Sequence, residues 1–284
     1  MPFAQSIVNN LVNQEFKTLT QFPLPNHFSK HIHHIEPHKQ ELNITTDTDI
    51  IFEIKRNGVS THGNDLLSNL WIEINLPKTT GGTKGTYTHW CNNTGAAIIK
   101  EATLLINEQE IDKHDSQWID IYNELTDNLE EHYFLLNKHN NLGYRFSNTD
   151  PFNCPPITLS IPLYFWFSNP NTMLPTCAIN DTIKIKITFR ALQELIISDV
   201  ADSNIFNNYG SQTIGLHLEY LAIDHIEKKK YMNIKIIAPK LQIIDWQPFY
   251  DKKYKLSGEM NLPVKELIWI IQPSSRRDSN NNII

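Results

Sequence analysis

The stretch from residue 161 to residue 190, IPLYFWFSNPNTMLPTCAINDTIKIKITFR, combines two strand patterns of different kinds. Its second half alternates apolar with polar residues from Ile183 to Arg190, which predicts a strand with one buried and one solvent-facing side. Its first half is apolar and aromatic from Leu163 to Phe167, which predicts a strand buried on both faces. A proline-containing loop separates the halves, so the stretch predicts strands packed in layers.

Strand patterns recur along much of the chain. Apolar residues alternate over 43–54, 66–76 and 98–106, and glycine-containing turns separate these segments. Many strands with few helices predict an all-β fold in the form of a β-sandwich, of which the jelly roll is the version with eight strands in two Greek keys. Segments 79–93 and 137–156 are predicted to be long loops at the outer surface or at a subunit contact.

One segment has a helical pattern instead. Its apolar residues recur at spacings of three and four, which predicts a helix between Ser116 and Lys138, on a connection outside the sandwich. These residues are Trp118, Ile121, Tyr122, Leu125, Leu129 and Tyr133.

Several long motifs resemble the major capsid protein family of the nucleocytoplasmic large DNA viruses. They are the 161–190 stretch, FEIKRNG and NDLLSNLWIEINLP within 52–77, IIKEATLLINEQEIDKHDSQWIDIYNEL at 98–125, and LHLEYLAIDHIEKKKY at 216–231. The resemblance implies the viral double jelly-roll fold, with the first jelly roll complete over 28–222. A connector with an incomplete second jelly roll is expected over 223–284, and the residues before the resemblance begins, 1–27, are predicted to form an N-terminal arm.

The second jelly roll is expected to be only partial. LPVKELIWIIQP at 262–273 resembles a segment inside the family's second jelly roll, and strands are predicted at 233–244, 254–262 and 266–272. At about 10 residues per strand and turn, this region supplies too few strands to close a sandwich. An open sandwich leaves apolar faces bare, so we expect a truncated copy, a split gene or a subunit completed in trans. The basic run EKKK at 227–230 is predicted to be a solvated patch on the connector.

Composition limits the classes of function. The formal net charge of -6 opposes a main role in neutralising nucleic-acid phosphates. Three widely spaced cysteines without a CxxC pair favour neither a disulfide framework nor a zinc knuckle. No run of about 18 apolar residues and no secretory signal is recognised, so we expect a soluble protein made in the cytosol.

The motif HIHHIEPH at 31–38 is the strongest candidate for a metal site. Imidazoles at alternate positions of a strand share one face and could share a metal, as the HxH motif does in cupin enzymes. Here Glu36 follows too closely, flanking glycines are missing, and the segment precedes the first expected sandwich strand. We therefore interpret His31, His33, His34 and His38 as a surface or interface cluster that charges below about pH 6.5, and we expect no metal and no cofactor.

An acidic stretch offers a second catalytic possibility. Paired carboxylates beside a histidine could perform acid–base chemistry, but acids directly before a helix can instead cap it. We favour the capping role and expect no catalytic residue, so the protein is predicted not to be an enzyme. The residues concerned are Glu108, Glu110, Asp112, His114 and Asp115.

The tryptophans allow a sugar-binding interpretation, because aromatic faces stack on sugars. Trp71, Trp166 and Trp269 lie in apolar runs, so we predict that they belong to the core. The patterns around Trp90 and Trp118 leave their environments open.

The resemblance implies a structural subunit of an icosahedral capsid, in which trimers with a pseudo-hexagonal outline tile the facets. It further implies self-association into homotrimers and a lattice, a location in the virion, and assembly in the host cytoplasm. Residues 3–19 have helical apolar spacing, and this arm could pack on a subunit or contact a minor capsid protein or an inner viral membrane. No specific nucleic acid is expected. A cupin-like metal enzyme and a carbohydrate-binding module remain as alternatives.

Overall fold

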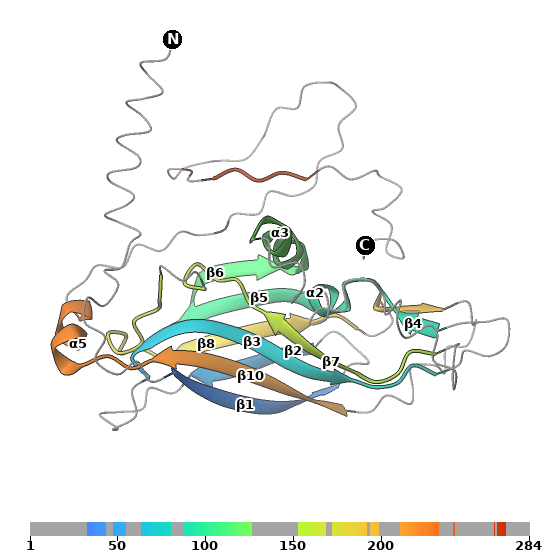
Figure 1. Cartoon of the computed structure of the whole chain (residues 1–284), viewed down its shortest axis with the longest axis horizontal. Helices are drawn as coiled ribbons and strands as arrows, with labels where there is room; N and C mark the ends of the chain where they lie inside the picture. The colour runs from blue at the N-terminus through green and yellow to red at the C-terminus, as the bar shows by residue number, and fades with distance from the viewer. Residues whose placement is uncertain are drawn as a thin grey trace, which may run out of the picture.

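The computed structural model describes residues 33–43, 48–54, 64–80, 88–126, 153–168, 172–191, 194–198, 211–232, 241, 264 and 266–270. Within these ranges the protein is a sandwich of two antiparallel sheets with short helices at its margins (Figure 1). The predicted arm over 1–27 lies outside the described residues.

The two sheets have the strand order of a jelly roll. Among the described residues, sheet A has the order β1-β10-β3-β7 and sheet B the order β2-β8-β5-β6, and every pairing in them is antiparallel. The chain passes repeatedly between the sheets, so strands distant in sequence become neighbours. The predicted all-β jelly-roll β-sandwich is therefore confirmed. The strands of sheet A are β1 His33–Asn43, β3 Leu66–Leu76, β7 Ile157–Pro162 and β10 Ser211–Leu221; those of sheet B are β2 Thr48–Ile54, β5 Ile99–Ile106, β6 Gln109–Asp115 and β8 Ile183–Phe189.

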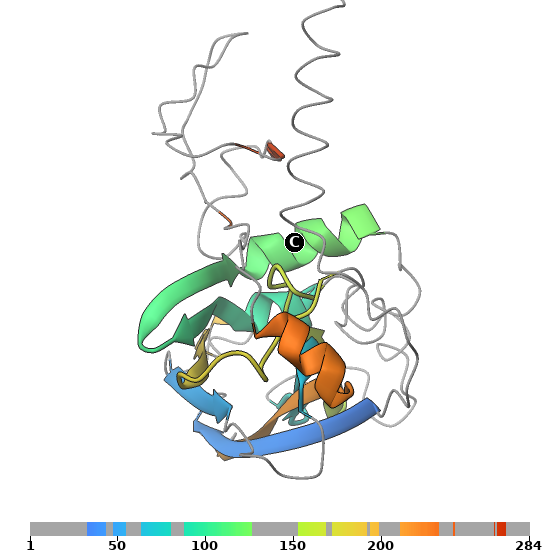
Figure 2. The ribbon, with the colours of Figure 1, turned by 90° about the vertical axis from the view of Figure 1, so that its left-hand side faces the viewer.

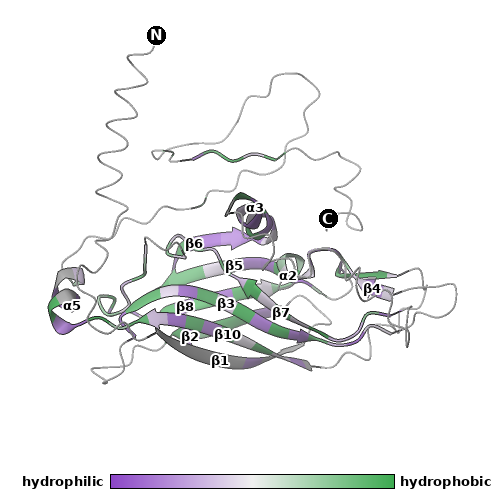
Figure 3. Ribbon diagram, in the orientation of Figure 1, coloured by the Kyte–Doolittle hydropathy of each residue, from purple (hydrophilic) through white to green (hydrophobic). Residues whose placement is uncertain are grey.

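The core lies between the sheets and follows the alternation of the strands. The predicted strand from Ile183 is confirmed as β8, where apolar residues are buried and the intervening polar residues are half-buried. Green and purple residues alternate along the strands in Figure 3. Burying each large apolar side chain contributes roughly 1.5–3 kcal/mol, so this face supplies most of the driving force for folding. Residues at most 1% exposed come from both sheets and include Phe52, Ile72, Leu104, Ile185 and Leu216.

The aromatic run at Leu163–Phe167 is not a strand, so that prediction is wrong. Strand β7 ends at Pro162, and residues 163–168 continue as irregular chain. Leu163, Phe165 and Phe167 are buried in the core, whereas Tyr164 and Trp166 are half-buried. The segment is bound to both sheets, because the Leu163 amide donates to the carbonyl of Leu70 on β3 and the Trp166 amide donates to Asp112 on β6. We call residues 163–168 the closure segment, since it joins the β7 side of sheet A to the β6 side of sheet B.

Helices and a small sheet flank the sandwich within the described residues. The predicted helix is confirmed as α3 Ser116–Thr126, beside β6 and on the side of the sandwich away from β1, and residues 127–138 lie outside the described part (Figure 2). Helix α2 spans Thr94–Ile98, and β4 Thr88–Trp90 pairs with β9 Ile196–Ser198. Residues 88–91 are buried, so the predicted surface loop at 79–93 is wrong for that part.

The tryptophan predictions are only partly correct. Trp166 packs against the core, but Trp71 is half-buried on the outer face of β3 and Trp269 is 73% exposed. Trp90, which the sequence left open, is fully buried. An apolar run therefore does not by itself indicate which of its aromatic residues point inward.

The described part of the predicted connector includes a helix attached to the sandwich. Helix α5 His225–Tyr231 contributes Tyr231 to a small apolar cluster with Leu66, Cys177 and Ile223. Within the predicted solvated patch at 227–230, Lys228 is paired with the buried carboxylate of Asp65 at 2.8 Å, so the prediction is wrong for Lys228. The described residues 266–270 form no strand, contrary to prediction. The remainder of the expected second jelly roll lies outside the described residues.

Candidate functional site

The histidine motif lies inside a strand of the sandwich. We predicted that it precedes the first strand, and this is wrong, because β1 begins at His33 and pairs along its length with β10. His34 lies opposite Tyr220 and His38 opposite Leu216, whereas His31 lies outside the described residues. In the described part of the chain, no group of three or more histidine, cysteine or acidic side chains is arranged to hold a metal.

The acidic residues Asp112 and Asp115 at the end of β6 accept hydrogen bonds from backbone amides. Asp115 caps α3, because its Oδ1 accepts the backbone N–H of Trp118 at 2.9 Å, which confirms the predicted capping role. Asp112 is 4% exposed and accepts the Trp166 amide through Oδ2 at 3.1 Å and the Lys113 amide through Oδ1 at 2.9 Å. These carboxylates therefore fasten the helix and the closure segment to β6.

His114 is the one histidine on β6, and it points into the core. Its ring is 1% exposed and packs against Phe165 with ring centroids 4.9 Å apart. Neither ring nitrogen makes a hydrogen bond of ordinary geometry within the described residues. Burial lowers the pKa of His114 to about 4, and the backbone of Asp115 opposes this shift only in part. The imidazole is thus neutral near pH 7.

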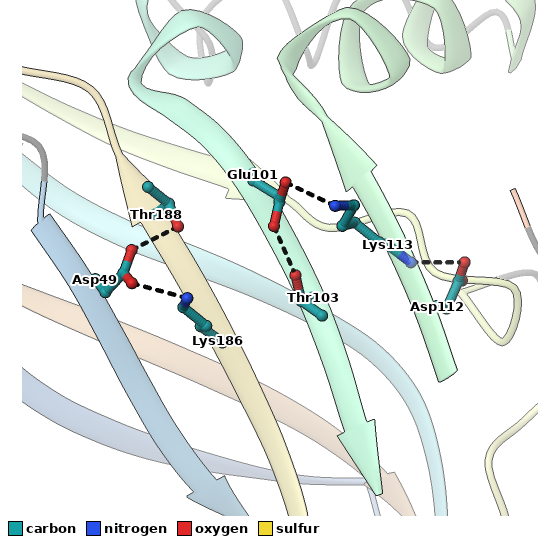
Figure 4. A network of polar contacts seen from close by, with 7 residues as sticks. All are labelled: Asp49, Glu101, Thr103, Asp112, Lys113, Lys186 and Thr188. Atoms are coloured by element: carbon teal, nitrogen blue, oxygen red, sulfur yellow. Dashed lines mark hydrogen bonds and ion pairs between the residues drawn. The ribbon is translucent and has the colours of Figure 1, made fainter. Parts of the chain in front are cut away.

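The outer face of sheet B carries charges that pair with one another. The strand register places Asp49, Thr188 and Glu101 in one row, and Lys186 and Lys113 in the next row. Lys186 lies 2.8 Å from Asp49 and Lys113 lies 3.0 Å from Glu101 (Figure 4). The hydrogen bond from Lys186 lowers the pKa of Asp49, and the bond to Glu101 raises that of Lys113. Such exposed pairs contribute little stability, typically below about 1 kcal/mol, but they keep this face polar and hydrated.

The outer face of sheet A carries a stacked aromatic pair. The rings of Trp71 on β3 and His217 on β10 are 5.3 Å apart and nearly parallel, with an interplanar angle of 4°. His217 Nε2 lies 3.7 Å from the carboxylate of Glu73. Because His217 covers one face of Trp71, the tryptophan acts first as a cross-strand packing residue.

None of these surfaces combines the nucleophile, base and orienting group of a hydrolytic site within hydrogen-bonding distance, as far as the described residues extend. The helices in that part of the chain are also too short or too polar to cross a membrane. The distinctive feature is instead the sandwich itself, with paired charges on the outer face of sheet B.

Comparison with known proteins identifies relatives of one kind. The model of the family described as "Major capsid protein N-terminus" matches residues 27–227. The major capsid protein of Phaeocystis pouchetii virus is 26% identical over 258 residues, which cover 79% of this chain and 48% of that protein. Probable capsid protein 4 of Acanthamoeba polyphaga mimivirus is 29% identical, covering 62% of this chain and 37% of that protein. The chain therefore spans about half or less of the length of these relatives.

A solved structure has the same fold. The PBCV-1 VP54 crystal structure, fitted into a reconstruction of the virophage Sputnik, aligns with a TM-score of 0.52 and 19% identity. The alignment covers 75% of this chain and 48% of that one. The jelly-roll strand order and the family match over 27–227 agree, and the chain belongs to the family of the major capsid protein N-terminus.

Proposed function

We propose that the chain is a structural subunit of an icosahedral viral capsid and that it associates into trimers with a pseudo-hexagonal outline. The family match over 27–227 is the observation that carries this proposal. On this proposal the chain resides in the virion and is assembled in the host cytoplasm. Its partners are further copies of itself, with minor capsid proteins and an inner viral membrane as additional contacts.

The form of the sandwich supports a building role. A shell gains its free energy from many repeated contacts between copies, each of modest area, so a subunit needs a rigid shape more than a reactive group. The core between the sheets is filled by apolar side chains, and the closure segment binds both sheets. The charge rows on sheet B suit hydrated contacts that can form and reform during assembly.

The oligomeric state of the purified full chain tests the proposal. We expect light scattering after size-exclusion chromatography to give three times the chain mass of 33.0 kDa, and electron micrographs to display pseudo-hexagonal particles. A protein that stays monomeric at every concentration would contradict the proposal.

The two alternatives give different results in the same preparation. A cupin-like enzyme would carry bound metal that is lost on replacing His31 and His33 with alanine. A capsid subunit should contain no metal, and the same variant should still have the mass of a trimer. A carbohydrate-binding module would be a monomer retained on a glycan array. Metal content and glycan retention measured beside the mass therefore separate the three functions.

A further inference from the structure

Helix α3 turns part of its apolar stripe away from the sandwich. Trp118, Ile121, Tyr122 and Leu125 follow the spacing of a single helix face, which ordinarily packs on a core. In the structure, the fully buried residue of the helix is instead Ile119, next to the 2%-exposed Asn123. Of the residues on the apolar face, Leu125 is 62% exposed, and Trp118, Ile121 and Tyr122 are half-buried. We call these four residues the α3 stripe.

The base of the α3 stripe is held in place by aromatic contacts. Tyr122 packs on Trp118 at 5.6 Å and on Tyr164 of the closure segment at 4.2 Å between ring centroids. The Trp118 indole N–H donates a hydrogen bond to the Tyr164 carbonyl at 3.3 Å, and the Tyr164 hydroxyl donates one to Oδ1 of Asn123. The stripe is therefore a preorganised surface, since its rings need little rearrangement to receive a partner.

The same chain exposes a second apolar surface in the segment 264–270, of which the structure describes residues 264 and 266–270. Five large apolar side chains within this short segment are 39–73% exposed. Such a density of exposed apolar residues is unfavourable in water and marks a segment that packs against something. The five residues are Val264, Leu267, Ile268, Trp269 and Ile270.

Two observations link the segment to the α3 stripe. Figures 1 and 2 place the segment, drawn in red, on the same side of the sandwich as α3. The pKa of Tyr122 is raised by burial and, to a smaller extent, by the negative charge of Glu266, so the Glu266 carboxylate is within electrostatic range of the Tyr122 hydroxyl.

We propose that the α3 stripe is the docking site for residues 264–270 of the same chain. Docking covers Leu125 and the outer edges of Trp118 and Tyr122 with the apolar side chains of the segment. It removes both apolar surfaces from water at once. Because segment and stripe belong to one polypeptide, the effective concentration of the segment at the stripe is high, in the millimolar range for a flexible tether.

Disulfide formation between introduced cysteines tests this contact in the full chain. The variant Leu125→Cys with Leu267→Cys should oxidise to an intramolecular crosslink roughly tenfold faster than the control Ile51→Cys with Leu267→Cys, because both pairs share the tether but only the first pair is held together by docking. Ile51 is a matched control, since it is 48% exposed and lies on β2. The three native cysteines are buried and do not compete. Equal rates in the two variants would overturn the proposal, and so would crosslinked dimers as the main product, which would assign the stripe to a second copy.

A second measurement does not depend on the geometry of one cysteine pair. Leu125→Glu adds a charge to the stripe at an exposed position, so the sandwich should remain folded while the segment is released. Chymotrypsin should then cleave at Trp269 several-fold faster than in the unmodified chain, whereas Ile51→Glu should leave the rate unchanged. An unchanged rate in Leu125→Glu would contradict docking. Both readouts are independent of trimer formation, so they separate this inference from the proposed capsid role.

Discussion

A single buried histidine gives the sandwich a stability that depends on pH. The pKa of His114 is lowered in the folded chain from 6.5 to about 4, so the unfolded chain binds the proton more tightly. The free energy of unfolding is therefore unaffected by His114 above about pH 6.5 and falls as the pH decreases towards 4. Below pH 4, His114 causes no further fall. The full effect is about 3 kcal/mol, since one pKa unit corresponds to about 1.4 kcal/mol.

The prediction for His114 is tested by urea unfolding at several pH values. His114→Phe keeps a ring beside Phe165 and should remove most of the loss of unfolding free energy between pH 6.5 and pH 4. His225→Gln, a change at the exposed start of α5, should leave the loss as it is. A similar loss in His114→Phe and the unmodified chain would show that other groups cause it.

Asp65 is a buried carboxylate that attaches helix α5 to the sandwich. Its Oδ2 accepts the Ile223 amide at 3.0 Å, and its Oδ1 lies 2.8 Å from Lys228 Nζ. Asp65→Asn removes the charge but keeps the shape, so it should lower the unfolding free energy by about 2 kcal/mol, the usual contribution of hydrogen bonds to a charged group. In Glu101→Gln, which breaks an exposed ion pair, the loss should stay below about 1 kcal/mol. Chemical denaturation of both variants measures the difference, and equal losses would refute the anchoring role.

At the scale of elements, the closure segment replaces a predicted strand and completes the core. Phe167 is fully buried and packs on Phe165 and Trp166 with centroid distances of 5.8 and 5.4 Å. Phe167→Ala should therefore cost about 3–5 kcal/mol, because it removes apolar area and leaves a cavity. Phe167→Leu, which fills most of the space, should cost much less. Thermal unfolding measures both, and a cost below about 1 kcal/mol for the alanine variant would place this ring outside the core.

Local patterns predicted some elements well and others poorly. The alternation from Ile183 predicted β8, and the spacing from Trp118 predicted α3, because each pattern matches the geometry of one isolated element. The run Leu163–Phe167 has no such period, so it could not distinguish a buried strand from irregular chain that inserts every second side chain. The histidine motif was misplaced because its polar residues concealed an edge strand, β1.

At the scale of the whole molecule, the three cysteines report on global unfolding. Cys91, Cys154 and Cys177 are buried and form no disulfide, and burial raises the pKa of Cys91 to about 12, so its reactive thiolate is scarce. We expect a thiol reagent such as Ellman's reagent to modify all three only after denaturation. In the native chain, modification should be no faster than opening of the sandwich. A thiol that reacts at once under native conditions would show that the fold is locally open.

The jelly roll as a whole was expected from the resemblance of long motifs, whereas alternation alone predicted only a layered β protein. A period of two tells which residues of a strand face inward, but it does not tell which strand lies beside it. The same holds for the candidate metal site. The sequence shows its histidines, but only the fold shows which residues of β10 lie beside them.

The local sequence was thus sufficient to predict the β class, the strand that begins at Ile183 and the helix that begins at Ser116. Short-range alternation and capping act within one element, so they can be read without the fold. Pairings such as Asn69 with Glu219, 150 residues apart, arose only from folding. So did the burial of His114, the anchoring of Lys228 and the outward turn of the α3 stripe. Each depends on contacts between segments that no local period encodes, because burial is a property of what packs against a residue.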